Sequence, residues 1–340
     1  MKPLVAPLRL RALCGDAAHK VSWLELFFDL IFVAAVAQVA EPLRDDYSVA
    51  GVARFSVLFA LVWWAWTGYA VFATRFDADD GVQLVLTVAQ VFVVAAMAAN
   101  ARDALDSRSA AGFAAASAVL RLILVGQYAR ARQVATARTL TTRYMIGHGV
   151  AAGVWLASAF VPAPARYLIW SIALIIDLGT PWLVLAAHVS VPSGAGHLPE
   201  RFGLFTLILL GEGVVAVMQG MESQETWPVS AATAAISAMA LLFGVWWWYF
   251  EGADAPAAQH IRSRTDAVRF HIWGYAHFPF YLGIVIAGVG LQRMVTSAAR
   301  APLTQIDVAV MASAGTLLAI SMWVIATTSA GDRGATRSIL

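Results

Sequence analysis

The sequence predicts an all-α fold, a polytopic membrane bundle of about ten transmembrane helices. Hydrophobic residues make up 60% of the 340 residues and charged residues 13%, about half the charged share of a soluble domain. The mean hydropathy is +0.70. The apolar residues gather in runs of about 20, long enough to cross a bilayer, and do not alternate as in a membrane barrel. These observations exclude a soluble enzyme, a nucleic-acid binder and a disordered scaffold, and they make the lipid bilayer the expected partner.

Ten runs meet the length rule, and each predicts one helix. In chain order they are 23–40, 51–73, 81–100, 110–129, 143–161, 166–186, 203–221, 229–250, 270–290 and 305–328. The fifth and sixth runs are joined by a tight turn with Pro162 and Pro164, which predicts a helical hairpin. Residues 1–20 hold no continuous apolar segment and no small-residue cleavage site, so we expect a retained tail and not a signal peptide. The whole of 1–340 is expected to form one transmembrane domain.

Charge asymmetry between the loops predicts the orientation. With the N-terminus inside, fifteen Lys and Arg residues, Arg201 among them, lie in cytoplasmic segments, and seven lie on the other side. By the positive-inside rule, both termini and the tail 1–20 are expected in the cytoplasm.

An internal repeat is indicated by a constant offset of 183 positions. This offset places Asp29 on Glu212, and three aromatic residues of one span on three of another; these pairs are Trp63 with Trp246, Trp64 with Trp247, and Trp66 with Tyr249. Six spans separate the copies, so the two units are predicted to be parallel repeats, at about 20–186 and about 200–328. Transporters built from repeats bind their substrates at the repeat interface, and we expect Asp29 and Glu212 to face one shared site.

Three acids lie deep within the predicted spans. Asp29 is about 10 Å along its helix from Ser22, and Asp177 and Glu212 lie nearer the middle of theirs, about 16 and 18 Å in. Glu212 stands between two glycines, and Asp177 is followed by Gly179 and Pro181, which predict a helix break at the membrane midplane. Ionisable residues at such depth face a bundle interior or a water-filled path.

Arg121 is the one base at the membrane core, and it cannot discharge by losing its proton. We therefore expect an ion pair with a carboxylate, Asp29 or Glu212 before Asp177. Three deep acids against one cation leave an acid surplus, so one or two of them should be hydrated, protonated or bound to a cation.

Each of these residues also has a purely structural explanation. Ser22 and Glu25 have the spacing of a capping box. A deep acid can belong to a structural ion pair, and Gly and Pro are common in membrane helices. His271 and His277 are six residues apart and point to different helix faces. Because no HExxH or tight ligand cluster occurs, we expect no metal and no cofactor, and we retain His277 as a candidate pathway residue.

Several segments resemble the signature of the bacterial low-temperature-requirement A family. In order they are Trp23-Leu-Glu25-Leu-Phe-Phe-Asp29-Leu-Ile-Phe-Val33, Thr74-Arg-Phe-Asp77, Glu200-Arg-Phe-Gly-Leu-Phe-Thr206, Leu210-Gly-Glu212, Trp246-Trp-Trp-Tyr-Phe250 and His277-Phe-Pro-Phe-Tyr-Leu-Gly283. The resemblance covers about residues 20–290. It implies a multi-pass protein of the bacterial cell membrane, and it implies no reaction.

Two functions compete at this stage. The first is a transporter or channel for a small solute or cation, possibly with protons, whose pathway residues are Asp29, Arg121, Asp177, Glu212 and His277. The second is an intramembrane enzyme for a lipid or isoprenoid, with Asp29 or Glu212 as the acid; its pocket would be lined by Trp63, Trp64, Trp246 and Trp247. A sensor or structural protein, with every deep charge paired, is a third reading.

Overall fold

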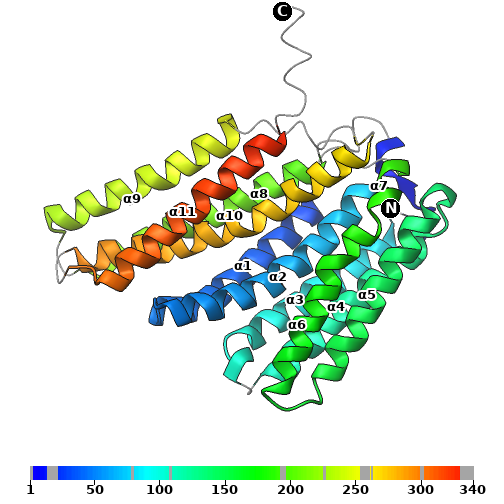
Figure 1. The fold of residues 1–340 in the computed structure, drawn as a ribbon, viewed down its shortest axis with the longest axis horizontal. Coiled ribbons are helices and arrows are strands. Elements are labelled where there is room, and N and C mark those ends of the chain that lie inside the picture. The colour runs from blue at the N-terminus through cyan, green and yellow to red at the C-terminus, as the bar shows by residue number, and fades with distance from the viewer. Residues whose placement is uncertain are drawn as a thin grey trace, which may run out of the picture. The chain divides into compact units, whose positions relative to one another are not determined.

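The computed structural model describes residues 3–13, 22–77, 80–106, 109–191, 197–224, 227–252, 261, 263–298 and 302–329. Of the predicted tail, residues 1, 2 and 14–20 lie outside these ranges. The described chain is almost entirely helical (Figure 1). The helices are α1 (Trp23–Asp45), α2 (Val49–Arg75), α3 (Gly81–Ala101), α4 (Ala110–Ala131), α5 (Arg138–Ser158), α6 (Ala165–Leu183), α7 (Leu185–Ser190), α8 (His197–Glu222), α9 (Val229–Trp247), α10 (Arg264–Ser297) and α11 (Gln305–Ser329).

Each of the ten predicted spans coincides with one long helix, which confirms the all-α membrane fold. Among the described residues, eight of these helices are long and apolar enough to cross a membrane, all except α5 and α6. These two fall short because polar side chains, His148 on α5 and Asp177 on α6 among them, lower their hydropathy. The sixth span ends earlier than predicted, at Leu183, and α7 follows it.

The chain divides into two compact units. Unit 1 comprises Met1–Val39, Ala60–Arg201 and Ala258–Val268, and unit 2 comprises Ala40–Phe59, Phe202–Ala257 and Arg269–Leu340. Asp29 and Glu212 belong to different units, so each is described in its own surroundings. The predicted repeat, and the shared site that it implies, stay predictions.

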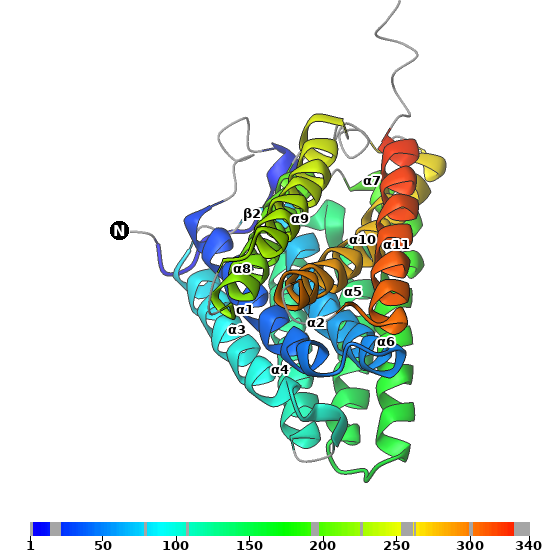
Figure 2. The same ribbon diagram turned by 90° about the vertical axis from the view of Figure 1, so that its left-hand side faces the viewer.

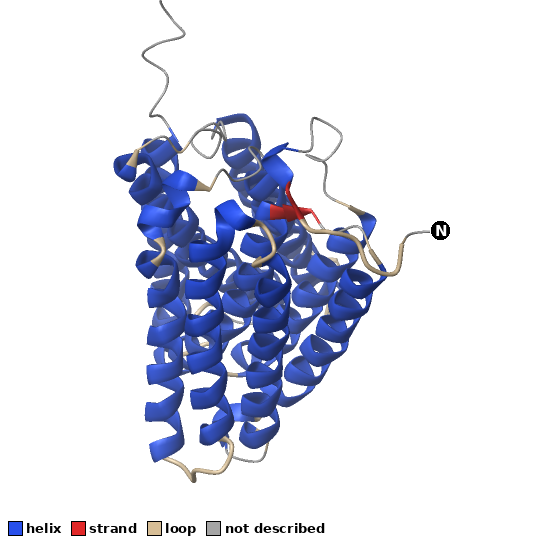
Figure 3. Ribbon diagram, turned by 90° about the vertical axis from the view of Figure 1, so that its right-hand side faces the viewer, coloured by secondary structure: helices blue, strands red, loops and turns tan. Residues whose placement is uncertain are grey.

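In unit 1, α3, α4, α5 and α6 pack in chain order, each against the next (Figure 1). Short strands β1 (Arg9–Leu10) and β2 (Phe76–Asp77) pair antiparallel, with Arg9 opposite Asp77 (Figure 3). Leu8 and Leu10 are buried in a cluster with residues from the neighbouring ends of α2, α4, α5 and α7. The segment 3–10 is thus packed onto one end of the helices of unit 1.

Unit 2 contains α9 and α11, most of α8 and α10, the end of α1 and the start of α2 (Figure 2). Glycines let these helices approach closely. A Cβ atom on Gly213 of α8 would lie 2.9 Å from Leu242 of α9, and one on Gly288 of α10 would lie 3.4 Å from the Cα atom of Gly213. Small residues at helix contacts are the usual means of close packing in membranes, where dispersion replaces the hydrophobic effect.

Candidate functional site

A buried ion pair joins α4 to α6 in unit 1. Arg121 donates to one carboxylate oxygen of Asp177, Oδ2, from Nε at 2.9 Å and from Nη2 at 2.8 Å. Its Nη1 donates to the carbonyl of Ser117 at 3.0 Å, and Trp155 Nε1 lies 3.4 Å from the same Oδ2. Both members of the pair are almost fully buried, 2% and 1% exposed. The positive and negative charges therefore neutralise each other inside the bundle.

The predicted ion pair of Arg121 is confirmed, but its expected partner was wrong. We expected Asp29 or Glu212, because a helix break beside Asp177 seemed to reserve that acid for a ligand. No such break occurs at midhelix: α6 continues through Gly179, and Pro181 lies in its last turn. The intact helix presents Asp177 to Arg121.

His148 on α5 lies beside this ion pair and is 5% exposed. Its Nδ1 is 3.7 Å from the second oxygen of Asp177, Oδ1, which is too long for a hydrogen bond. In the described part of the chain, neither ring nitrogen of His148 nor Oδ1 of Asp177 has a hydrogen-bond partner. Three unsatisfied buried polar atoms in one place are unusual, because such atoms normally find a partner or an ordered water.

A small cavity adjoins these atoms. Its lining includes Trp64, Gly68 and Gln90 in addition to Arg121, His148 and Asp177, and its free space is about that of one water molecule. Trp64, a predicted pocket aromatic, is thus on this lining. Trp63 is buried and packs against Trp64 with ring centres 5.6 Å apart.

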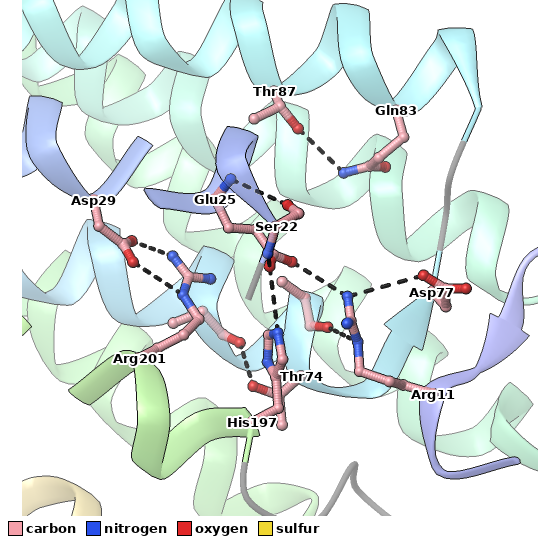
Figure 4. Close-up of polar contacts among 12 residues, drawn as sticks. Arg11, Ser22, Glu25, Asp29, Thr74, Asp77, Gln83, Thr87, His197 and Arg201 are labelled. Carbon is pink, nitrogen blue, oxygen red and sulfur yellow. Dashed lines mark hydrogen bonds and ion pairs between the residues drawn. The ribbon is translucent and has the colours of Figure 1, made fainter. Parts of the chain in front are cut away.

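A second polar cluster, the junction network, joins α1 to the first turn of α8 within unit 1 (Figure 4). Asp29 is fully buried and faces Arg201, whose Nη2 donates to Oδ1 and whose Nε donates to Oδ2 at 3.3 Å. Trp66 Nε1 donates to the same Oδ1 at 2.7 Å. The guanidinium also lies over the rings of Trp66 and Tyr69, 5.6 and 5.0 Å from their centres. Asp29 and Arg201 therefore form a buried ion pair, reinforced by charge-assisted hydrogen bonds.

Glu25 forms the other half of the junction network. The predicted capping box is confirmed, since the Ser22 amide donates to Glu25 Oε2 at 2.9 Å and the Glu25 amide donates to Ser22 Oγ at 3.2 Å. The same carboxylate accepts from Arg11 at 3.2 Å and lies 3.3 Å from His197 Nε2. Glu25 thus ties the N-terminal segment, α1 and α8 together, in addition to its capping role.

Glu212, the third deep acid, lies near the middle of α8, about 22 Å along the axis from His197 and about 15 Å from Glu222. Its side chain is half-buried. Among the described residues of unit 2, none forms a hydrogen bond or an ion pair with its carboxylate. A Cβ atom on the preceding residue, Gly211, would meet nothing within 4 Å, so there is open space on that side of the helix.

The remaining predicted residues lie elsewhere in unit 2. His277 is fully buried; its Nδ1 donates to the carbonyl of Trp273 at 2.8 Å, and its Nε2 accepts from the Tyr249 hydroxyl at 3.0 Å. The donor and acceptor roles follow because a carbonyl oxygen can only accept. Trp246 and Trp247 form an aromatic cluster on α9 with ring centres 6.4 Å apart, and Trp247 is 57% exposed.

Several residues of these clusters were not predicted. Arg11 and Arg201 were counted only as cytoplasmic charges, and His197 and the position of His148 beside Asp177 had no signal in the hydropathy. Within the described ranges, no group of three or more His, Cys, Asp and Glu side chains is placed to hold a metal ion.

Comparison with known proteins gives two findings. The family model described as bacterial low temperature requirement A protein (LtrA) matches residues 20–340. A curated protein of Rhizobium meliloti (strain 1021), named uncharacterized protein RA0937, is 27% identical over 289 residues, which cover 80% of this chain and 68% of that protein. No solved structure matches the chain.

Proposed function

Since the chain belongs to the bacterial low temperature requirement A (LtrA) family and has the helices of a multi-pass membrane protein, we propose that it is a transport protein that moves a cation or a small solute, with protons as the coupled or transported ion. The ion is carried by Glu212.

One observation carries the proposal: of the three deep acids, two have a buried arginine partner, and Glu212 has none among the described residues of its unit. Asp29 is neutralised by Arg201, and Asp177 by Arg121. A carboxylate inside a bilayer without a counter-charge is costly, so it holds a proton, binds a cation or faces water. Each of these states is what an ion-carrying residue needs.

The surroundings of Glu212 support this role. On one side of it, Gly213 and Gly288 bring the backbones of α8 and α10 together. On the other side, a Cβ atom on Gly211 would meet nothing within 4 Å, so that face of α8 is not packed against described residues. Glu212 thus lies at the edge of a close helix contact.

The alternative, an intramembrane enzyme that protonates a lipid or isoprenoid, has less support. Its acid would have to release a proton at the reaction centre. Asp29 accepts hydrogen bonds from Arg201 and Trp66, so both of its oxygens already have partners. A fully buried carboxyl group that is paired in this way is poorly placed to reach a substrate.

The location belongs to the same proposal: the bacterial cell membrane, with both termini on the cytoplasmic side. It is supported by the excess of basic residues on that side, which remains when Arg201, buried against Asp29, is left out. Reporter fusions at each loop test the orientation, and a periplasmic signal from a loop assigned to the cytoplasm would overturn it.

Flux measurements test the transport function. The full chain is reconstituted in lipid vesicles with an internal pH dye, and a potassium diffusion potential or a sodium gradient is imposed. We expect proton or sodium flux in the wild type, its loss in Glu212→Gln, and partial retention in Glu212→Asp. The control is Glu222→Gln, which removes an exposed acid at the end of the same helix. Equal flux in Glu212→Gln and the wild type would overturn the proposal.

A further inference from the structure

The cavity beside His148 has the features of a binding site rather than of a packing defect. A packing defect in a protein interior is lined by apolar atoms and stays dry. Here much of the lining is apolar, from residues such as Leu120 and Leu124, but the side chains of Asp177 and His148 also line the space. Oδ1 of Asp177 and both ring nitrogens of His148 are buried and lack partners in the described structure. A buried water needs two to four polar partners, and these atoms can supply them.

The side chains around the cavity select the ligand. In the described part of the chain, no group of three or more His, Cys, Asp and Glu side chains is placed to hold a metal ion, so the cavity lacks the ligands that a metal needs. A water molecule needs fewer partners and offers two donors and two acceptors. It can donate to Oδ1 of Asp177 and accept from, or donate to, Nδ1 of His148, because these two atoms are 3.7 Å apart on side chains that line the cavity.

We propose that this cavity is a site for one water molecule and one proton, in which His148 is the proton acceptor. A hydronium ion that enters the cavity transfers a proton to Nδ1 of His148 and leaves water behind. The imidazolium then has the carboxylate Oδ1 of Asp177 opposite it. The proton is released by the reverse step, so no other reactant is consumed.

The groups that face His148 can stabilise a protonated, positively charged imidazole ring. From α6, Asp177 supplies a negative oxygen. From α4, Tyr128 stacks on the imidazole with ring centres 5.8 Å apart, and from α5 Tyr144 does so at 5.9 Å. A cation is attracted to the faces of aromatic rings. The opposing charge, Arg121 on α4, already pairs with Asp177, and α3 contributes the neutral amide of Gln90 to the cavity.

His188 offers a natural contrast. Its Nδ1 lies 3.1 Å from Nη2 of Arg75, which can only donate, so Nδ1 must be the acceptor. Its Nε2 then carries the proton and donates to the Tyr144 hydroxyl at 3.1 Å. A second proton on His188 would place a positively charged imidazolium directly beside the Arg75 guanidinium. His148 is thus free to take up a proton, and His188 is locked in its neutral form.

This site is independent of the transport function proposed for Glu212. Solid-state NMR of the full chain, labelled with ¹⁵N-histidine and embedded in lipid nanodiscs, tests it. On acidification we expect one resonance to change from neutral imidazole to imidazolium, its assignment following from its loss in His148→Asn. The His188 resonance should stay neutral. A His148 resonance that stays neutral while His188 changes, or one that never changes, would overturn the proposal.

Two separate glycine-to-alanine variants test whether the cavity holds a bound water, without altering His148. Gly68 lines the cavity, and an added Cβ atom would lie 2.9 Å from Leu124 Cδ1 and 4.0 Å from His148 Cε1. We expect Gly68→Ala to displace the water and to abolish the imidazolium signal. The matched control is Gly126→Ala, whose Cβ atom meets nothing within 4 Å. Retention of the signal in Gly68→Ala would contradict a bound water as the proton's route. Loss in both variants would show that the signal reports on helix packing and would equally overturn the site.

Discussion

Arg121 donates two hydrogen bonds to the same oxygen of Asp177 and leaves the other oxygen without a partner in the described structure. This one-sided pairing neutralises the carboxylate and still leaves an acceptor 3.7 Å from Nδ1 of His148, on a side chain that lines the cavity. The ion pair thus has a structural role and a chemical consequence.

The structural role predicts a large loss of stability when one partner is removed. Asp177→Asn leaves the Arg121 guanidinium buried and uncompensated, which costs about 3–5 kcal/mol for buried pairs in soluble proteins. Thermal unfolding of the detergent-solubilised protein measures the change.

The matched control is the double variant Arg121→Gln, Asp177→Asn, which removes both charges. We expect it to be more stable than either single variant, with a coupling energy above about 0.5 kcal/mol. Strictly additive effects of the two substitutions would show that the pair contributes no interaction energy.

The close contact of α5 and α6 that aligns His148 with Asp177 depends on Gly147. A Cβ atom at this position would lie 2.4 Å from Oγ1 and 2.5 Å from Cγ2 of Thr180, a β-branched side chain that cannot swing away. We therefore predict that Gly147→Ala destabilises the protein by about 1–3 kcal/mol.

Gly153→Ala is the control for this prediction, because it lies on the same helix and its Cβ atom would meet nothing within 4 Å. Thr180→Ala should partly rescue Gly147→Ala, since it removes both contacting atoms. Equal unfolding temperatures for the Gly147 and Gly153 variants would refute the contact.

The junction network predicts a modest effect for Trp66→Phe. This variant keeps an aromatic ring beside Arg201 and removes the 2.7 Å hydrogen bond to Asp29. Side-chain hydrogen bonds between membrane helices contribute about 0.6 kcal/mol on average and at most about 1.7. Trp23→Phe, at a residue that is 88% exposed, is the control and should change the unfolding temperature little. A larger loss in the control would place the effect outside the network.

Asp80, at the start of α3, predicts a pH effect outside the membrane-spanning segments. Burial raises the pKa of this carboxyl, but hydrogen bonds from the amides of Ala6 and Gln83 and from Arg130 outweigh it, so the pKa is lowered overall. A lowered pKa in the folded state stabilises the fold above the ordinary carboxyl value, near 4. This stabilisation is lost as the pH falls through the lower pKa of the folded protein.

The difference in unfolding temperature between the wild type and Asp80→Asn is therefore expected to shrink on acidification. A difference that is constant with pH would show that the ionised form of Asp80 contributes nothing.

Hydropathy predicted the helices well because each helix must shield its backbone from lipid by itself. It placed the start of α8 too late, at 203 instead of His197, because polar residues in the first turn lower the local hydropathy. For the same reason Arg201 was assigned to a loop, and the partner of Asp29 was missed.

A periodic signal could have found that partner. Glu25 and Asp29 are four residues apart on α1, and so are His197 and Arg201 on α8. His197 contacts Glu25, and Arg201 contacts Asp29. Residues at this spacing share one helix face. Which faces meet depends on packing between distant helices, and hydropathy carries no information on that. The partner of Arg121 was wrong for this reason, although its need for a partner followed from its charge alone.

The central claim is that Glu212 carries a proton or a cation, whereas Asp29 and Asp177 are occupied in ion pairs with arginine. Dicyclohexylcarbodiimide measures this most directly, because it enters the bilayer and couples only to protonated carboxyl groups. After labelling the full chain in lipid at mildly acidic pH and digesting it, mass spectrometry should find the adduct on Glu212, absent from Glu212→Gln and reduced by a competing cation. Asp29 and Asp177 should stay unlabelled. An adduct on Asp29 or Asp177, with Glu212 unmodified, would contradict the account.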